Sequence, residues 1–284
     1  MAHATEQATN SSTRRHIVET RHGHMHVRVA GSGTGTPFVF LHPSLCSGQV
    51  YKPFIELLGT DRTLLMPDRL GFGDSDRLEK PITLEGYASA TLDALDALGV
   101  DDFDALGIHS GSCELIELAT AHPARVRRAA LITIPYFTPD EVAHFKDRYV
   151  SHPEPTNDGS HLSWYWRWWR EGGFDGSAPR TIDYPPALTQ EWVTRHLTAL
   201  PHFWWAYHAV IQYPTAQRLP QITQPLLLFR TPDDLEEQTE AAIPLLPQQA
   251  ELVDAPGFSD VLQYYAWSPE DAAEIANHLR RFVS

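Results

Sequence analysis

The residues best suited to chemistry lie in a turn flanked by two glycines, Gly107 and Gly111. The spacing G-x-Nu-x-G is typical of a sharp elbow between a strand and a helix, which holds the central side chain in a site above the sheet. With the glycines as flanks, the central residue is His109. If Ser110 were central instead, the branched Ile108 would crowd a position that needs a small residue. We therefore place His109 at the apex and expect its imidazole to face a pocket.

An imidazole at this place suits proton transfer. The pKa of an unperturbed histidine is about 6.5, so its ring can both give and take a proton near neutral pH. Proton movement beside a stabilised negative oxygen is the chemistry of isomerisation, cyclisation, elimination and retro-aldol cleavage. The two cysteines, Cys46 and Cys113, have no metal-ligand spacing. We therefore expect neither a metal ion nor a cofactor.

The segments around this turn alternate between short apolar strands and helices. Buried strands are expected at residues 25–29, 38–41, 63–66, 104–106, 129–134 and 226–229, and helices at 83–98, 113–119 and 270–282. Such alternation predicts an α/β fold whose mostly parallel sheet is covered on both faces.

The alternation stops between Pro135 and about Arg218. This segment is rich in histidine and proline and holds seven of the eight tryptophans. Residues 163–170 and 202–208 within it have the character of lid helices. We predict a disordered lead-in at 1–15, a core domain at 16–135 and 219–284, and a helical cap at 136–218.

Composition narrows the class of protein. The formal net charge of −14 over 284 residues disfavours nucleic-acid binding, which needs a basic face. No stretch approaches the roughly 18 apolar residues of a membrane span, and the polar first 15 residues do not resemble a signal peptide. We expect a cytoplasmic protein whose partner is a small molecule, with neither nucleic acid nor membrane. The oligomeric state cannot be deduced from the sequence.

Four further motifs resemble the α/β-hydrolase superfamily, in its branch with a helical cap. They are FVFLHPS at 38–44, DRLGFGDS at 68–75, the strand and loop at 225–234, and VDAPGF at 253–258. The resemblance spans residues 16–284 and implies an α/β-hydrolase fold. It also implies that the amides of Ser44 and Ser110 form an oxyanion hole, that Asp234 is the catalytic acid, and that position 258 carries the catalytic histidine.

Two of the three catalytic positions depart from the family pattern. His109 replaces the family's Ser, Asp or Cys nucleophile, and Phe258 replaces the histidine, which leaves Asp234 as the one retained member. Phe258 cannot transfer a proton, so acyl-enzyme turnover would lack its proton shuttle. The dipeptide His42-Pro43 also replaces the usual His-Gly, which stiffens the loop that carries the Ser44 amide.

Three interpretations follow. The first is a non-hydrolytic enzyme of cyclase, isomerase or lyase type, with His109 as general acid or base on a bulky aromatic or apolar small molecule from natural-product biosynthesis. The second is an atypical hydrolase that uses His109 with Asp234. The third is a ligand-binding protein that kept the pocket and lost turnover.

The cap predicts an aromatic binding pocket, since flat ligands suit aromatic walls. The cap tryptophans could instead serve only to pack the lid on the core. A lid histidine, His202 or His208, could also supply the missing base. The residues expected to line the pocket are His42, Phe258, Trp164, Trp168, Trp204, Trp205 and His208.

Overall fold

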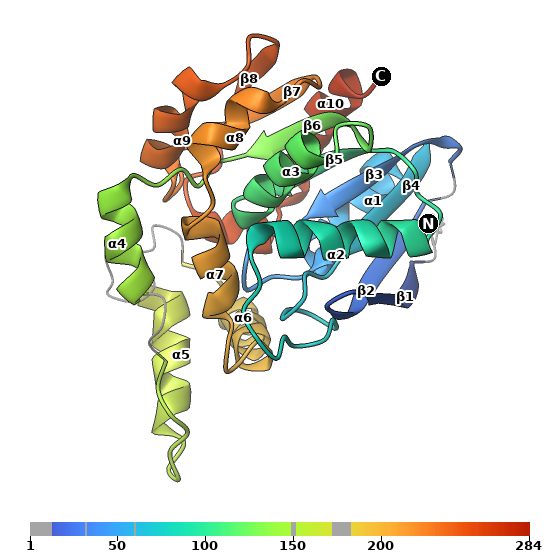
Figure 1. The fold of residues 1–284 in the computed structure, drawn as a ribbon. Helices are drawn as coiled ribbons and strands as arrows, with labels where there is room; N and C mark the ends of the chain where they lie inside the picture. The colour runs from blue at the N-terminus through green and yellow to red at the C-terminus, as the bar shows by residue number, and fades with distance from the viewer. Residues whose placement is uncertain (1–12, 32, 60, 149–151, 172–182) are drawn as a thin grey trace, which may run out of the picture.

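The computed structural model describes residues 13–31, 33–59, 61–148, 152–171 and 183–284. Its strands are Arg14–Thr20 (β1), Gly23–Ala30 (β2), Gly35–Leu41 (β3), Arg62–Pro67 (β4), Phe103–Ile108 (β5), Val126–Ile132 (β6), Leu226–Arg230 (β7) and Ala250–Asp254 (β8). They form one sheet in the order β1-β2-β4-β3-β5-β6-β7-β8 (Figure 1). β2 is antiparallel to β1 and β4, whereas all other neighbouring strands are parallel.

Helices cover both faces of this sheet. α2 (Leu84–Ala97) and α3 (Ser110–Ala121) pack on one face, and α1 (Pro53–Leu58) and α10 (Pro269–Phe282) on the other, each pair with its own apolar core. Because β5 lies between two covered faces, all of its residues are buried. The mostly parallel, doubly covered sheet predicted from the alternation of strands and helices is therefore confirmed.

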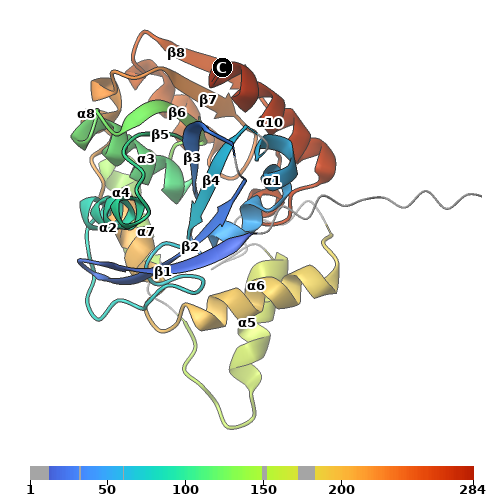
Figure 2. The ribbon, with the colours of Figure 1, turned by 90° about the vertical axis from the view of Figure 1, so that its right-hand side faces the viewer.

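The chain leaves the sheet after β6 and returns to it at β7. In between, the described residues form α4 (Pro139–Arg148), α5 (Ser160–Glu171), α6 (Pro186–Thr198), α7 (Trp204–Ile211) and the short α8 (Thr215–Arg218). Figures 1 and 2 show α5 and α6 packed together beyond one end of the sheet. The remaining elements are α9 (Glu236–Ala242) and 3-10 turns at Gly48–Tyr51, Leu219–Gln221, Ile243–Leu245 and Val261–Tyr265. None of the described helices is long and apolar enough to cross a bilayer.

The structure differs from the sequence-based expectation at both edges of the sheet. β1 and β8 are mostly exposed, so neither has the apolar run that indicates a buried strand. Arg14 and Arg15, expected in the disordered lead-in, belong to β1, while residues 1–12 lie outside the described residues. β6 ends at Ile132 rather than at residue 134, because Thr133 takes a left-handed φ of 57° that ends the strand.

Candidate active site

The turn after β5 is a strained elbow. His109 is the single residue between β5 and α3. Its φ of 52° and ψ of −116° are a backbone conformation that residues other than glycine rarely adopt. A Cβ on Gly107 would lie 2.4 Å from the carbonyl oxygen of Gly111, and one on Gly111 would lie 2.1 Å from that of Leu41. Only glycine fits at these two positions, so the chain can turn sharply enough to present His109 at the apex.

The ring of His109 reaches a buried carboxylate directly. Its Nε2 lies 3.2 Å from Oδ2 of Asp233, in the segment after β7. The same Oδ2 accepts hydrogen bonds from the hydroxyl of Tyr264 at 2.8 Å and that of Thr231 at 3.1 Å, and Oδ1 accepts from the amide of Leu235 at 2.9 Å. Asp233 is therefore buried with both oxygens paired, as a buried carboxylate must be.

The carboxylate that contacts His109 is Asp233, one residue before the predicted Asp234. Asp234 is exposed, although one of its carboxylate oxygens lies within 4.8 Å of the ligand atoms of His109 and Asp233. Because Asp233 accepts the hydrogen bonds described above, it is the carboxylate that orients the imidazole. Asp234 adds negative charge at the edge of the site.

Phe258, at the position where the resemblance implies a histidine, packs against Tyr264. Phe258 is fully buried and stacks on Tyr264, with ring centroids 5.3 Å apart and an interplanar angle of 13°. The Tyr264 ring meets His109 edge-on at 5.5 Å. The partner of Phe258 is this tyrosine, whose hydroxyl donates a hydrogen bond to Asp233. One imidazole thus extends from the apex to the acid without a second histidine between them.

The charge of Asp233 controls the protonation of His109. Burial lowers the pKa of His109, but the charge and hydrogen bond of Asp233 outweigh it and raise the pKa above its ordinary value. Burial raises the pKa of Asp233, yet His109 brings that pKa below its ordinary range. The pair therefore favours an imidazolium that donates its Nε2 proton to the carboxylate. Because Nε2 keeps its proton toward the carboxylate, Nδ1 is the ring atom that gains or loses a proton.

The amide of Ser44, expected to face a substrate oxygen, is instead hydrogen-bonded to a side chain of the elbow. It donates to Oγ of Ser110 at 2.8 Å, and the Ser44 hydroxyl donates to the same oxygen at 3.0 Å. Nη1 of Arg69 lies 2.9 Å from this oxygen as a third donor. The Tyr265 hydroxyl holds the carbonyl of Ser44 at 2.5 Å. The two residues predicted to form an oxyanion hole, Ser44 and Ser110, are thus hydrogen-bonded to each other.

Arg69 belongs to a buried ion pair beneath the elbow. Its Nε lies 2.8 Å from Oε2 of Glu114, whose other oxygen accepts a hydrogen bond from Thr91 at 2.6 Å. The backbone amide of Arg69 donates to Nε2 of His42 at 2.9 Å. Burial, and secondarily the charge of Arg69, lower the pKa of His42 to about 3. His42 is therefore a neutral ring fixed inside the loop, where it lines a small hollow together with Arg69 and Glu114.

The predicted pocket residues of the cap lie on two helices. Trp164 and Trp168 are on α5, where Trp164 meets Tyr165 at 5.1 Å and Trp168 meets His196 at 5.1 Å. On α7, Trp204 packs against His208 at 4.9 Å, and Trp205 stacks on His202 at 3.9 Å. Trp204 and His202 line a groove of about 570 Å³ in the cap, and Trp205 lines a smaller hollow between cap and core. The part these rings play in binding stays a prediction.

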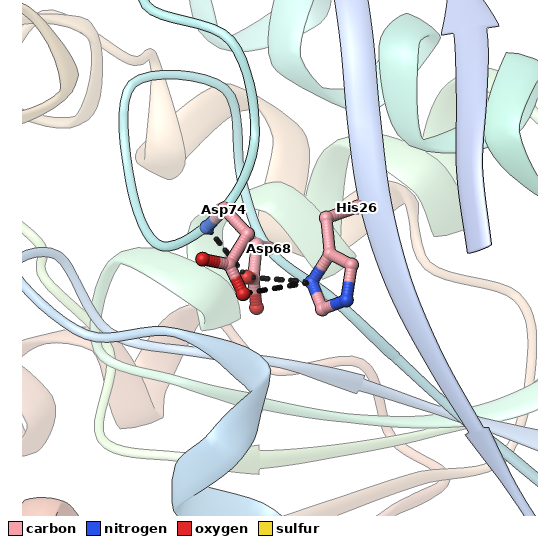
Figure 3. A group of neighbouring side chains, drawn as sticks. All are labelled: His26, Asp68 and Asp74. Atoms are coloured by element: carbon pink, nitrogen blue, oxygen red, sulfur yellow. Dashed lines mark hydrogen bonds and ion pairs between the residues drawn. The ribbon is translucent and has the colours of Figure 1, made fainter. Parts of the chain in front are cut away.

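A second group of histidine and aspartate side chains lies within the DRLGFGDS segment and on β2 (Figure 3). Asp68 accepts hydrogen bonds from His26 at 2.9 Å, Arg28 at 2.7 Å, and the amides of Gly48 at 2.7 Å and Asp74 at 2.9 Å. Although burial raises the pKa of Asp68, His26 and Arg28 lower it to about 2. These contacts bind three segments of the chain together, which gives the group a structural role.

Sequence reasoning missed Asp233, Tyr264, Arg69 and Glu114. One signal could have found the last of these, because Ser110 and Glu114 are four residues apart and so share one face of a helix. Tyr264 and Arg69 gave no such signal, since their partners are distant in the sequence.

Comparisons with known proteins agree with this fold. A family model of the alpha/beta hydrolase fold matches residues 36–235. A 2-hydroxymuconate semialdehyde hydrolase of Pseudomonas sp. (strain CF600) is 30% identical over 105 residues, which cover 36% of this chain and only 37% of that relative. A solved hydrolase from Pseudomonas aeruginosa PA01 has a TM-score of 0.75 at 19% identity and covers 98% of this chain and 100% of its own. The enol-lactonase from Burkholderia xenovorans LB400 has a TM-score of 0.75 at 17% identity, with 94% and 99% covered.

Proposed function

Since the chain belongs to the α/β-hydrolase fold family, we propose that it is an enzyme in which His109, paired with Asp233, moves a proton on a bound small molecule. The observation that carries this proposal is the direct contact of 3.2 Å between the ring at the elbow apex and the buried carboxylate. In a serine hydrolase of this fold, a nucleophile, a histidine and an acid share the work. Here the imidazole of His109 occupies the nucleophile position and contacts the acid, Asp233, directly.

The chemistry follows from the two nitrogens of that ring. When the ring is neutral, its one proton stays on Nε2 toward Asp233, so Nδ1 can remove a proton from a carbon next to a carbonyl group, and the ring becomes an imidazolium. The electron pair of the broken C–H bond moves to the carbonyl oxygen, which becomes an enolate. Return of the proton to another atom completes an isomerisation, and loss of a leaving group completes an elimination. Phe258, which has no titratable atom, takes no part in these steps.

We further propose that the substrate is bulky and aromatic or apolar. The support is the density of aromatic rings in the cap, where Trp168, Trp169 and Trp192 are largely buried beside one another. Aromatic walls offer a large contact area to a flat molecule. Hydrolysis is the second candidate, with His109 as base for an attacking water, and it is favoured by the relative that is named a hydrolase.

A generic proton-abstraction probe tests the first candidate. In 5-nitrobenzisoxazole, a base removes the C3 proton, the C–H electron pair forms a C≡N bond, and the N–O bond breaks to give a coloured phenolate. We expect the rate of this elimination to fall about 100-fold in His109→Ala, within the usual contribution of a general base. His122→Ala serves as the matched control, because His122 is exposed at the far end of α3, and it should match wild type.

Esters separate the two candidates. Wild type should cleave 4-nitrophenyl butyrate no faster than His109→Ala does. Turnover of this ester that depends on His109, with no elimination activity, would favour hydrolysis instead. A protein whose elimination and ester cleavage rates are both indifferent to His109→Ala would refute His109 as the catalytic group.

A further inference from the structure

The hydroxyl oxygen of Ser110 lies among two N–H donors and one neighbouring hydroxyl group. The amide of Ser44 lies 2.8 Å away, Nη1 of Arg69 lies 2.9 Å away, and the hydroxyl of Ser44 lies 3.0 Å away. A serine oxygen has two lone pairs and one hydrogen of its own. The two N–H groups can only donate, so they engage both lone pairs. The hydrogen of Ser110 then points either to the Ser44 hydroxyl oxygen, 3.0 Å away, or to an acceptor on a bound molecule.

The charge behind this arrangement comes from Arg69. Its side chain is 4% exposed, and its partner Glu114 is similarly buried. Glu114 and Thr91 fix the guanidinium in place, and the ring of Tyr87 lies 5.7 Å from its central carbon. Because little water reaches these groups, the donors polarise the Ser110 hydroxyl more strongly than they would at the surface. A polarised hydroxyl is a stronger hydrogen-bond donor than a free one.

We propose that the Ser110 hydroxyl is the catalytic donor that stabilises the negative oxygen formed when His109 removes a proton, and that Arg69 is its positioning residue. The proposal rests on the proposed function. The substrate proton goes to Nδ1 of His109, and the electron pair goes to the substrate oxygen. Ser110 keeps its own proton and donates a hydrogen bond to that oxygen, while the Ser44 amide acts through Ser110 rather than on the substrate.

An opposite role for Ser110 makes an opposite prediction. If its oxygen merely blocked the oxyanion hole, removing it would free the Ser44 amide for the substrate, and catalysis would stay equal or improve. Ser110→Ala therefore distinguishes donor from obstacle. With 5-nitrobenzisoxazole as probe, we expect kcat/KM to fall about 100-fold, at the lower end of the usual loss on removing one oxyanion donor. An unchanged or increased rate would overturn the proposal.

A neighbouring serine supplies the control for general damage to the elbow. Ser112 is also in the first turn of α3, and its hydroxyl donates to the carbonyls of Gly107 and Ile132 rather than toward the site. Ser112→Ala should leave the elimination rate within about twofold of wild type. Failure of the proposed function is recognised separately, because His109→Ala would then leave the rate unchanged. A rate that depends on His109 but not on Ser110 would overturn the present proposal alone.

The role of Arg69 is tested as a pair with Glu114, because removing the arginine alone would leave a buried carboxylate without its cation. The double variant Arg69→Gln with Glu114→Gln keeps a neutral amide pair of similar shape. We expect it to lose as much activity as Ser110→Ala, and to lose nothing further when added to Ser110→Ala. Losses that multiply would show that Arg69 does not act through Ser110.

The dependence of the elimination rate on the leaving group distinguishes loss of a hydrogen-bond donor from general structural damage. Benzisoxazoles with poorer leaving groups place more negative charge on the phenolate oxygen during elimination. If Ser110 stabilises that charge, Ser110→Ala should slow the poorer leaving groups more than the 5-nitro compound. An equal loss across the series would overturn the assignment of Ser110 as the donor.

Discussion

The exchange Asp233→Asn tests the central pair of the site. The substitution keeps the shape of the side chain and its ability to accept a hydrogen bond from the His109 ring, but it removes the negative charge. Burial of His109 is unchanged, and burial alone lowers the pKa of a histidine. Without the carboxylate, the pKa of His109 should therefore fall from above its ordinary value to below it.

The magnitude follows from the separation of 3.2 Å between Nε2 and Oδ2. At an effective dielectric constant of about 20, two unit charges at this distance attract by about 5 kcal/mol, which is an upper limit of about 4 pKa units. Opposite charges at such distances usually shift a pKa by about 1 to 3 units. We expect a fall of about 2 units or more in Asp233→Asn.

The assay is a pH titration of the histidine rings by ¹H–¹⁵N NMR. The protein has 15 histidines, so the resonance of His109 is assigned by its absence in His109→Ala. Asp234→Asn is the matched control, because this carboxylate is exposed and its charge is screened. It should shift the pKa of His109 by less than about half a unit, a small screened effect. An unchanged pKa in Asp233→Asn, or equal shifts in both variants, would refute the assignment of Asp233 as the partner.

Three further outcomes are expected. Gly111→Ala should abolish the native fold in circular dichroism and thermal unfolding, because its Cβ would lie 2.1 Å from the carbonyl oxygen of Leu41; a folded variant would show that the elbow can relax. Tyr264→Phe keeps the ring but removes a donor to Asp233, so denaturant unfolding should show a loss of about 1.5–3 kcal/mol, and an unchanged midpoint would contradict that hydrogen bond. The pKa of Asp68 is lowered to about 2. Its ionised carboxylate therefore contributes about 2–3 kcal/mol to the free energy of unfolding above pH 4, and this contribution disappears as the pH falls toward 2. In unfolding curves measured at different pH values, Asp68→Asn should lack this decrease in stability.

The elbow could be predicted from the sequence because its requirements are local. Gly107 and Gly111 are needed where backbone atoms approach each other too closely for a Cβ, and that need leaves a fixed spacing in the chain. The buried strands were similarly evident, since a strand covered on both faces is a short run of apolar residues. The edge strands were not, because their exposed faces carry no such pattern.

The hydrogen bonds and ion pairs of the site could not be predicted, because they join segments that are distant in the sequence. Asp233 and Asp234 are neighbours of the same type, and only the path of the chain after β7 decides which one turns inward. Arg69 and Ser110 are 41 residues apart, and no pattern in the sequence pairs them. The resemblance to a family pointed to Asp234, whereas the neighbouring Asp233 is the carboxylate that contacts the His109 ring.

The elbow presents a ring nitrogen where serine enzymes of this fold present an oxygen, and this determines which inhibitors suit the protein. Fluorophosphonates and sulfonyl fluorides mark serine enzymes by forming a lasting bond to an activated oxygen. At this elbow the serine oxygen, that of Ser110, already has its lone pairs engaged by N–H donors. Such reagents should leave the protein unmarked, so it would escape a covalent survey of a cell extract. We expect the protein instead to bind flat, reversible ligands that carry a negatively charged oxygen.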